Sequence, residues 1–247
     1  MSQFFSIHPE TPQGRLINQA VDILQSGGVI AYPTDSAYAL GCLLDNKSGA
    51  ERIKQIRKLE DDHNFTLVCQ DLSELSRYAL VDNAAYRQIK HSTPGPYTFI
   101  FEASKEVPRR LMNPKRKTIG LRVPDNAIAQ ALLRELGEPL MSATLLLPED
   151  DYPLSDPYDI RTTLERDVDL VIDGGYCGLD PTSVIDMSGD ETQVLRQGLG
   201  DALCGARAKT GHACRKASSQ RDPHHTCLLY TSDAADERSS VALGGRR

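Results

Sequence analysis

The chain has 247 residues, of which 40% are hydrophobic and 25% charged, a composition that excludes wholesale disorder, collagen-like repeats and a coiled coil. No apolar run approaches the roughly 18 residues of a transmembrane helix, and the N-terminus lacks the features of a secretory signal, so we expect a cytoplasmic protein without a membrane partner. The formal net charge of −6 is divided into −9 over residues 1–200 and +3 over residues 201–247, and an acidic body argues against nucleic-acid binding by bulk charge.

Predicted helices and strands alternate through residues 1–200. Apolar residues at helical spacing, some followed by a closing glycine, predict helices at Arg15–Ser26, Lys47–Leu59, Asp82–His91, Asn126–Leu136 and Asp156–Arg166. Runs rich in β-branched and aromatic residues predict strands at Val29–Tyr32, Phe65–Cys69, Tyr97–Phe101, Thr118–Val123, Leu140–Leu147, Val168–Ile172, Thr182–Asp186 and Gln193–Arg196. This order predicts an α/β fold, a single domain with a large twisted mixed sheet flanked by helices.

Residues 201–247 differ in character from the rest of the chain. They lack periodic apolar patterning, and Cys204, Cys214 and Cys227 are not paired at zinc-ligand spacing. The stretch CLLYTSDAADE (Cys227–Glu237) resembles a translated sequencing-adapter read-through. We interpret residues 201–247 as a tail of doubtful origin, a frameshift or adapter read-through rather than a folded domain. The cysteines of residues 1–200 are too scattered for a disulfide framework, and we expect no structural metal.

Three short polar side chains follow the predicted strand Val29–Tyr32. Pro33 stops the strand, and Thr34, Asp35 and Ser36 come directly after it. Ligands of open α/β sheets bind outside the carboxyl ends of strands, so this segment is a candidate binding site. The alternative is a polar turn without a ligand.

Cations gather at two further places. Arg57 stands at the end of the predicted helix Lys47–Leu59, where it is either a solvated cation that complements the helix dipole or a bidentate phosphate clamp. Arg122 lies within a strand between Leu121 and Val123, so alternation places it on the opposite face from both. There we expect it to pair with a carboxylate, a phosphate or a bound anion in a polar cleft.

The densest basic cluster of the body precedes Arg122 in the chain. It consists of Arg109, Arg110, Lys115, Arg116 and Lys117. Lysines and arginines of this kind form either a solvated face or a face that contacts nucleic-acid phosphates.

Six segments, taken in order, resemble the YrdC family and most closely its YciO branch. They are YPTDSAYALG (32–41), IRKLEDDHNFTLVCQDLSEL (56–75), PGPYTFIF (94–101), TIGLRVP (118–124), PTSVID (181–186) and VLRQG (194–198). The resemblance implies a twisted α/β sheet with a concave, positively charged cavity. It also implies an activity related to threonylcarbamoyl-AMP synthesis from threonine, bicarbonate and ATP, which serves tRNA modification. Double-stranded RNA binding is likewise ascribed to the family.

The same resemblance implies roles for particular residues. Thr34 and Ser183 would contact threonine, and Arg122 would contact its carboxylate. A nucleotide, with Mg²⁺ accompanying ATP, would be held by Thr118, Arg196, Arg57 and Thr144, of which the last two stand where synthases carry lysine and serine.

Four positions depart from the synthase pattern. Leu59 replaces an arginine, Leu146 an asparagine, Glu60 a proline and Val68 a histidine. Losing one preorganised transition-state contact costs roughly 2.7–4 kcal/mol. We therefore predict a diverged threonylcarbamoyl-AMP synthase-like protein that binds ATP or an acyl-adenylate with weak or absent synthase activity. The alternative is a module that binds double-stranded RNA or tRNA through the basic cluster without catalysis.

Overall fold

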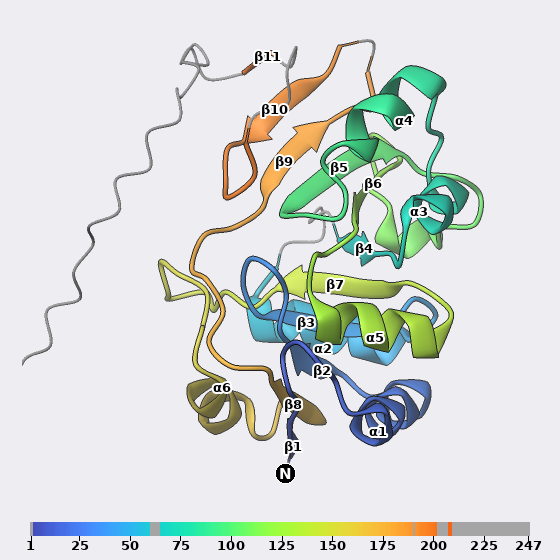
Figure 1. Ribbon diagram of the computed structural model, residues 1–247. Helices are drawn as coiled ribbons and strands as arrows, with labels where there is room; N and C mark the ends of the chain where they lie inside the picture. The colour runs from blue at the N-terminus through green and yellow to red at the C-terminus, as the bar shows by residue number, and fades with distance from the viewer. Residues whose placement is uncertain (1, 60–64, 190, 202–206, 209–247) are drawn as a thin grey trace, which may run out of the picture. The chain divides into compact units, whose positions relative to one another are not determined.

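The computed structural model describes residues 2–59, 65–189, 191–201 and 207–208. Within them an 11-stranded mixed sheet runs in the order β1-β8-β2-β3-β7-β4-β6-β5-β9-β10-β11 (Figure 1). The strands are β1 (Gln3–Ser6), β2 (Ile30–Tyr32), β3 (Ala39–Leu43), β4 (Thr66–Val68), β5 (Tyr97–Glu102), β6 (Thr118–Arg122), β7 (Leu140–Thr144), β8 (Leu170–Asp173), β9 (Ser183–Asp186), β10 (Gln193–Arg196) and β11 (Arg207–Ala208). Antiparallel pairs join β2, β3, β7 and β4, and from β4 to β11 parallel and antiparallel pairs alternate, as at the parallel pair β4 and β6 and the antiparallel pair β6 and β5.

Six α-helices accompany the sheet in the described residues. They are α1 (Gly14–Gln25), α2 (Lys47–Arg57), α3 (Leu72–Tyr78), α4 (Asn83–Lys90), α5 (Ala127–Leu136) and α6 (Pro157–Leu164). Five of them begin after an Asn or Asp whose side chain accepts a hydrogen bond from a backbone amide of the first turn, the residues being Asn46, Asp71, Asp82, Asn126 and Asp156. This capping satisfies amides that the helix itself leaves without a partner.

The mixed sheet with flanking helices confirms the predicted α/β fold, although four of its strands and α-helices were not predicted. These are β1, β3, α3 and β11, all short. The predicted strand Leu140–Leu147 is too long, because β7 ends at Thr144 and the Leu145 amide turns to the carbonyl of Tyr38 at 2.9 Å. None of the described helices combines the length and apolar character needed to cross a bilayer.

The two faces of the sheet carry separate hydrophobic clusters. One cluster joins α1 and α5 to alternate residues of β2, β3, β7 and β8, among them Ile30 and Leu170. The other includes residues of α2, α3, α4 and α6 together with Leu67, Leu121 and Phe99 on the opposite face. On the α1 and α5 face, the part of the sheet made by β4, β6, β5 and β9 carries Thr66, Gly120 and Thr98 beside Ile100 and Val184, and the candidate site lies there.

The residues around the predicted domain boundary at 200 are only partly described. One compact unit extends from Met1 to Cys214, and within its last part β11 pairs in parallel with β10 through Arg207 and Ala208. Residues 202–206 and 209–247 of the predicted tail lie outside the described residues. The interpretation of the tail therefore stays a prediction.

Candidate nucleotide site

A cavity of about 420 Å³ opens on the polar part of this face. The strand register places Ser142, Thr66, Gly120 and Ile100 in one row across β7, β4, β6 and β5, and all four line the cavity. Of the described helices, α2 alone contributes to the lining, through Arg57. The cavity is therefore a section of the sheet surface where small side chains replace the large ones that helices cover elsewhere.

Gly120 leaves space at the base of the cavity, because it has no side chain there. A Cβ at this position would lie 3.0 Å from Oγ1 of Thr66, 3.3 Å from the carbonyl oxygen of Phe65 and 3.4 Å from Cγ2 of Thr98. These separations are at or below van der Waals contact, so any side chain would crowd its neighbours and occupy part of the hollow. A glycine inside a strand commonly marks such a close approach.

Hydroxyl groups on the floor bond to one another. The hydroxyls of Thr98 and Thr182 are 2.9 Å apart. The Tyr32 hydroxyl lies 2.9 Å from Oγ of Ser142, which donates to the Leu40 carbonyl at 3.1 Å. Burial raises the pKa of Tyr32 to about 12, against the opposing effect of the Ser142 hydrogen bond. The floor is thus neutral and internally satisfied, so ionic contacts must come from the walls.

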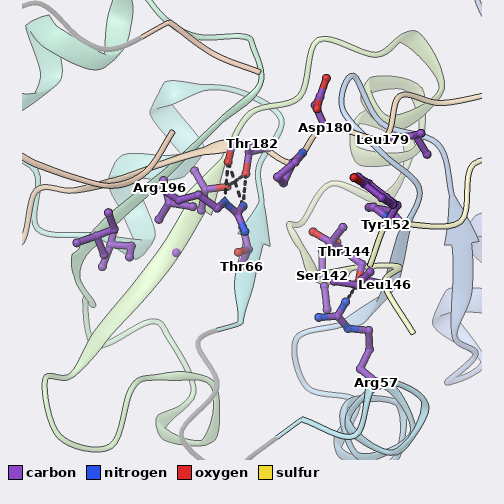
Figure 2. Close-up of a pocket in the computed structure, with 18 of the residues that line it drawn as sticks. Arg57, Thr66, Ser142, Thr144, Leu146, Tyr152, Leu179, Asp180, Thr182 and Arg196 are labelled. Atoms are coloured by element: carbon purple, nitrogen blue, oxygen red, sulfur yellow. Dashed lines mark hydrogen bonds between the residues drawn. The ribbon is translucent and has the colours of Figure 1, made fainter. Parts of the chain in front are cut away.

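Two arginines face the cavity from different sides (Figure 2). Arg57 donates from Nη1 to the Thr144 carbonyl at 2.6 Å, and its buried Nε has no hydrogen-bond partner. Arg196 donates from Nε and Nη2 to the Thr182 carbonyl at 3.1 and 3.0 Å. Neither forms an ion pair with a carboxylate of the described residues. Desolvation lowers the pKa of both guanidinium groups, so an anion between them would relieve the cost of holding these charges.

The rest of the wall is mixed in character. Leu146, Tyr152 and Leu179 lie on the same side as Arg57 in Figure 2, and Tyr152 and Leu179 are 66% and 48% exposed although they are large and apolar. Asp151 and Asp180 also line the cavity. The positive charge expected of the cavity is therefore confined to the two arginines and is offset in formal charge by two carboxylates.

The structure brings together some of the predicted site residues and separates others. Arg57, Thr144 and Arg196, three of the four residues predicted to hold a nucleotide, line the cavity. Thr118, predicted with them, does not line it: it is buried at the end of β6 opposite Glu102. Ser183 lies on the other face of β9, where its hydroxyl donates to the Gly200 carbonyl at 2.5 Å and accepts from the Gly198 amide at 2.9 Å. Its neighbour Thr182 lines the cavity instead.

Arg122 and Thr34 meet in a separate polar cluster at the far end of β6. Arg122 forms an ion pair with Asp35 and donates to the hydroxyls of Ser36 and Thr34 at 2.9 and 3.3 Å. Both side chains of the ion pair are 9% exposed. Of the three partners expected for Arg122, the structure shows a carboxylate. Nε of Arg122 and Oδ2 of Asp35 are buried without a hydrogen-bond partner, so the cluster has unused capacity for a further polar group.

The basic cluster predicted to contact RNA is divided by internal contacts. Arg110 donates to the Leu44 carbonyl. Arg116 forms an ion pair with Asp186 at 2.8 Å and donates to the Ser188 hydroxyl at 2.9 Å. Burial disfavours the Asp186 carboxylate, but the Ser188 hydrogen bonds and Arg116 outweigh it and hold the pKa of Asp186 below its usual value. Two of the five cations are therefore already engaged within the fold.

The departures from the synthase pattern fall in different places. Leu146 lines the cavity, where an asparagine would offer polar atoms to a ligand. Leu59 is partly buried against the larger hydrophobic cluster instead. Val68 is buried in β4 beside Arg122 of β6, and Glu60 lies outside the described residues. Of the described departures, Leu146 is the one that changes the chemistry of the cavity itself.

Sequence reasoning missed the residues that make the floor: Thr66, Thr98, Gly120, Ser142 and Thr182. A signal was present in the strands, where small or polar residues alternate with large apolar ones, as in Thr118-Ile119-Gly120-Leu121. Alternation of this kind marks one polar and one buried face of a sheet. Within a single strand, this alternation shows which residues share a face. It does not give the register between strands, which the structure supplies.

A family model for Sua5, YciO and YrdC proteins, described as telomere recombination, matches residues 22–198. The chain is 61% identical over 201 residues to the YciO protein of Escherichia coli K12, covering 81% of this chain and 98% of that protein. It is 31% identical over 159 residues to a threonylcarbamoyl-AMP synthase of Coxiella burnetii, covering 64% of this chain and 84% of that protein.

Two solved structures share the fold. The crystal structure of E. coli YciO matches with a TM-score of 0.80 and 61% identity, over 81% of this chain and 98% of that one. P. abyssi Sua5 complexed with L-threonine matches with a TM-score of 0.73 and 22% identity, over 80% of this chain and 58% of that one.

Proposed function

The chain belongs to the Sua5, YciO and YrdC family, and from this premise we propose that it binds an adenine nucleotide or an acyl-adenylate in the cavity between Arg57 and Arg196. The family assignment confirms the resemblance drawn from the motifs, and threonylcarbamoyl-AMP synthases are among the more distant relatives. The observation that carries the proposal is the pair of arginines that line one cavity and have no carboxylate partner among the described residues.

Phosphate groups suit these two side chains. A guanidinium group presents a planar set of donors that matches phosphate oxygens in pairs. Arg57 still has a buried, unpartnered Nε, and both arginines are already held by backbone carbonyls, so little side-chain entropy remains to be lost on binding. The cavity volume of about 420 Å³ falls in the range of sites that hold a molecule of nucleotide size.

Threonine is the second ligand we propose. Arg122 retains an unpartnered Nε while its Nη2 contacts the Thr34 and Ser36 hydroxyls. The free donor suits a carboxylate that would share Arg122 with Asp35. The P. abyssi Sua5 structure that shares this fold is a complex with L-threonine. Bicarbonate would then carboxylate the threonine amine with loss of water. A carbamate oxygen would attack the α-phosphorus of ATP, breaking its bond to the bridging oxygen of the β-phosphate, so that pyrophosphate leaves.

Weak or absent synthase activity follows from the walls of the cavity. Leu146 offers no hydrogen-bond donor where a synthase would carry an asparagine, and one such contact is worth roughly 2.7–4 kcal/mol in a transition state.

The cavity also offers ligands for the metal ion that accompanies ATP. Asp151 and Asp180 line it and supply carboxylate oxygens, the ligands that Mg²⁺ prefers.

Isothermal titration with ATP and Mg²⁺, AMP, and ATP with threonine and bicarbonate tests the proposal. Arg57→Ala and Arg196→Ala are each expected to weaken nucleotide binding by about 10- to 150-fold, because a hydrogen bond to a charged group is worth about 1.5–3 kcal/mol. Arg134→Ala, which removes an exposed cation of α5 away from the cavity, is the matched control. Absence of binding by all three ligand mixtures would overturn the proposal.

The alternative function, a module for double-stranded RNA or tRNA, has less support. Arg110 and Arg116 make internal contacts, which leaves Arg109, Lys115 and Lys117 for an RNA backbone. Binding through these residues should weaken steeply as salt rises, whereas a nucleotide between Arg57 and Arg196 should respond less.

A further inference from the structure

We propose that a second cavity, formed by the connection between β5 and β6, binds a small anion that carries two or more phosphoryl groups. The cavity measures about 520 Å³. Lys105, Arg109 and Lys117 line it together with the apolar side chains of Val107, Met112 and Pro114. None of its lining residues belongs to the cavity between Arg57 and Arg196, so this site goes beyond the proposed function.

The charge of this cavity is of one sign. No aspartate or glutamate is among its described lining residues. Lys105, Arg109 and Lys117 also form no ion pair with any carboxylate of the described part of the chain. Three exposed cations that line one hollow repel one another, and an anion bound there would offset that repulsion by its own attraction to each of them.

The frame around the cations is fixed by backbone contacts. Oδ1 of Asn113 accepts from the amides of Lys115 and Arg116 at 3.0 and 2.9 Å. The Lys117 amide donates to the Asn113 carbonyl at 2.9 Å, and Lys117 is held with φ at +54°. On the other side, Ser104 binds the Tyr78 carbonyl through its amide at 2.9 Å. The cations therefore extend from a set position, which reduces the cost of ordering them around a ligand.

A small anion fits this arrangement better than an RNA duplex. A duplex presents its phosphates in rows and needs cations spread along a surface. Here Arg110 and Arg116, which would extend such a row, are turned to the Leu44 carbonyl and to Asp186. The remaining cations surround a hollow whose volume is typical of small-molecule sites.

Isothermal titration of the full chain with inorganic pyrophosphate tests this site. The test variant combines Lys105→Gln, Arg109→Gln and Lys117→Asn, since asparagine tolerates the left-handed conformation of Lys117. Lys115→Gln is the matched control, because Lys115 is exposed on the same turn and does not line the cavity. Arg196→Ala separates this site from the first cavity. The thermal midpoint of each variant confirms that it is folded, as expected for substitutions at exposed positions.

The triple variant is expected to bind pyrophosphate about 3- to 150-fold more weakly, the combined effect of losing three exposed ionic contacts. Lys115→Gln and Arg196→Ala should leave a pyrophosphate site of wild-type affinity. Three results would overturn the proposal: no saturable binding by the wild-type chain, an equal loss in Lys115→Gln, or a site that Arg196→Ala abolishes and the triple variant retains.

Discussion

Substitution of Gly120 tests whether the proposed nucleotide site is the cavity between Arg57 and Arg196. Its φ is not in the left-handed region, so the backbone accepts other residues there, and the obstacle is space. An added Cβ would lie 3.0 Å from the Thr66 hydroxyl and 3.3 Å from the Phe65 carbonyl. Overpacking of this kind lowers the free energy of unfolding by about 1–3 kcal/mol. Replacing a glycine within a strand by alanine raises it by about 0.5–1 kcal/mol. Gly120→Ala should therefore cost at most about 2.5 kcal/mol.

Gly120→Val adds two further methyl groups above the same floor. These would occupy part of the volume that we assign to the nucleotide, and about 1–3 kcal/mol of overpacking against the ligand corresponds to roughly a 5- to 150-fold loss of affinity. ATP binding by calorimetry and thermal unfolding of the same samples give the two readouts. Gly14→Ala, where an added Cβ would meet nothing within 4 Å, is the control. A folded Gly120→Val protein that binds ATP as tightly as wild type would refute the assignment of this cavity.

Three further predictions follow from the same structure. Leu146→Asn combined with Leu59→Arg should raise ATP turnover in the presence of threonine and bicarbonate, and no gain would contradict the reasoning on the missing contact. Asp186→Asn should lower the free energy of unfolding at pH 7 by about 0.5–1 kcal/mol, because Arg116 is 53% exposed. The folded-state pKa of Asp186 is depressed, so this stability is present above the unfolded pKa of about 3.9 and is lost as pH falls through the folded pKa; urea midpoints at pH 7 and pH 3 that change equally in both proteins would count against it. Removing residues 201–247 should shift the thermal midpoint by less than about 4 °C, which corresponds to about 1 kcal/mol, and a larger fall would show that the tail contributes to the fold.

The sequence predicted the larger elements because their patterns are local. Residues of α1 and α5 repeat at helical spacing, and the β5 and β6 segments are rich in β-branched and aromatic residues. β3 was missed because its residues, Ala39–Leu43, are buried throughout and show no alternation. A short apolar run of that kind carries no period from which a strand can be distinguished from a buried turn.

Only part of the cavity lining was predicted, because the lining comes from elements that are far apart in the sequence. Arg57, Thr144 and Arg196 come from α2, β7 and β10, and only the strand order brings these three elements to one cavity. Motif resemblance identified them without that order. It also selected Ser183, whose side chain lies on the other face of β9, while Thr182, one residue earlier, lines the cavity. Since side chains alternate between faces, an error of one residue moves a prediction to the opposite side of the sheet.

Under the proposed function, binding and catalysis in this cavity would depend on different residues. Arg57 and Arg196 would contact a nucleotide in its ground state and its transition state alike, and such uniform binding sets affinity without raising the rate of the chemical step. The asparagine that Leu146 replaces would act where charge develops, and its loss lowers the rate. The chain should therefore bind ATP with the affinity of a nucleotide site and turn it over slowly. Arg196→Ala should weaken binding, whereas Leu146→Asn should change turnover and leave the dissociation constant nearly unchanged; a tighter dissociation constant without faster turnover in Leu146→Asn would contradict this division.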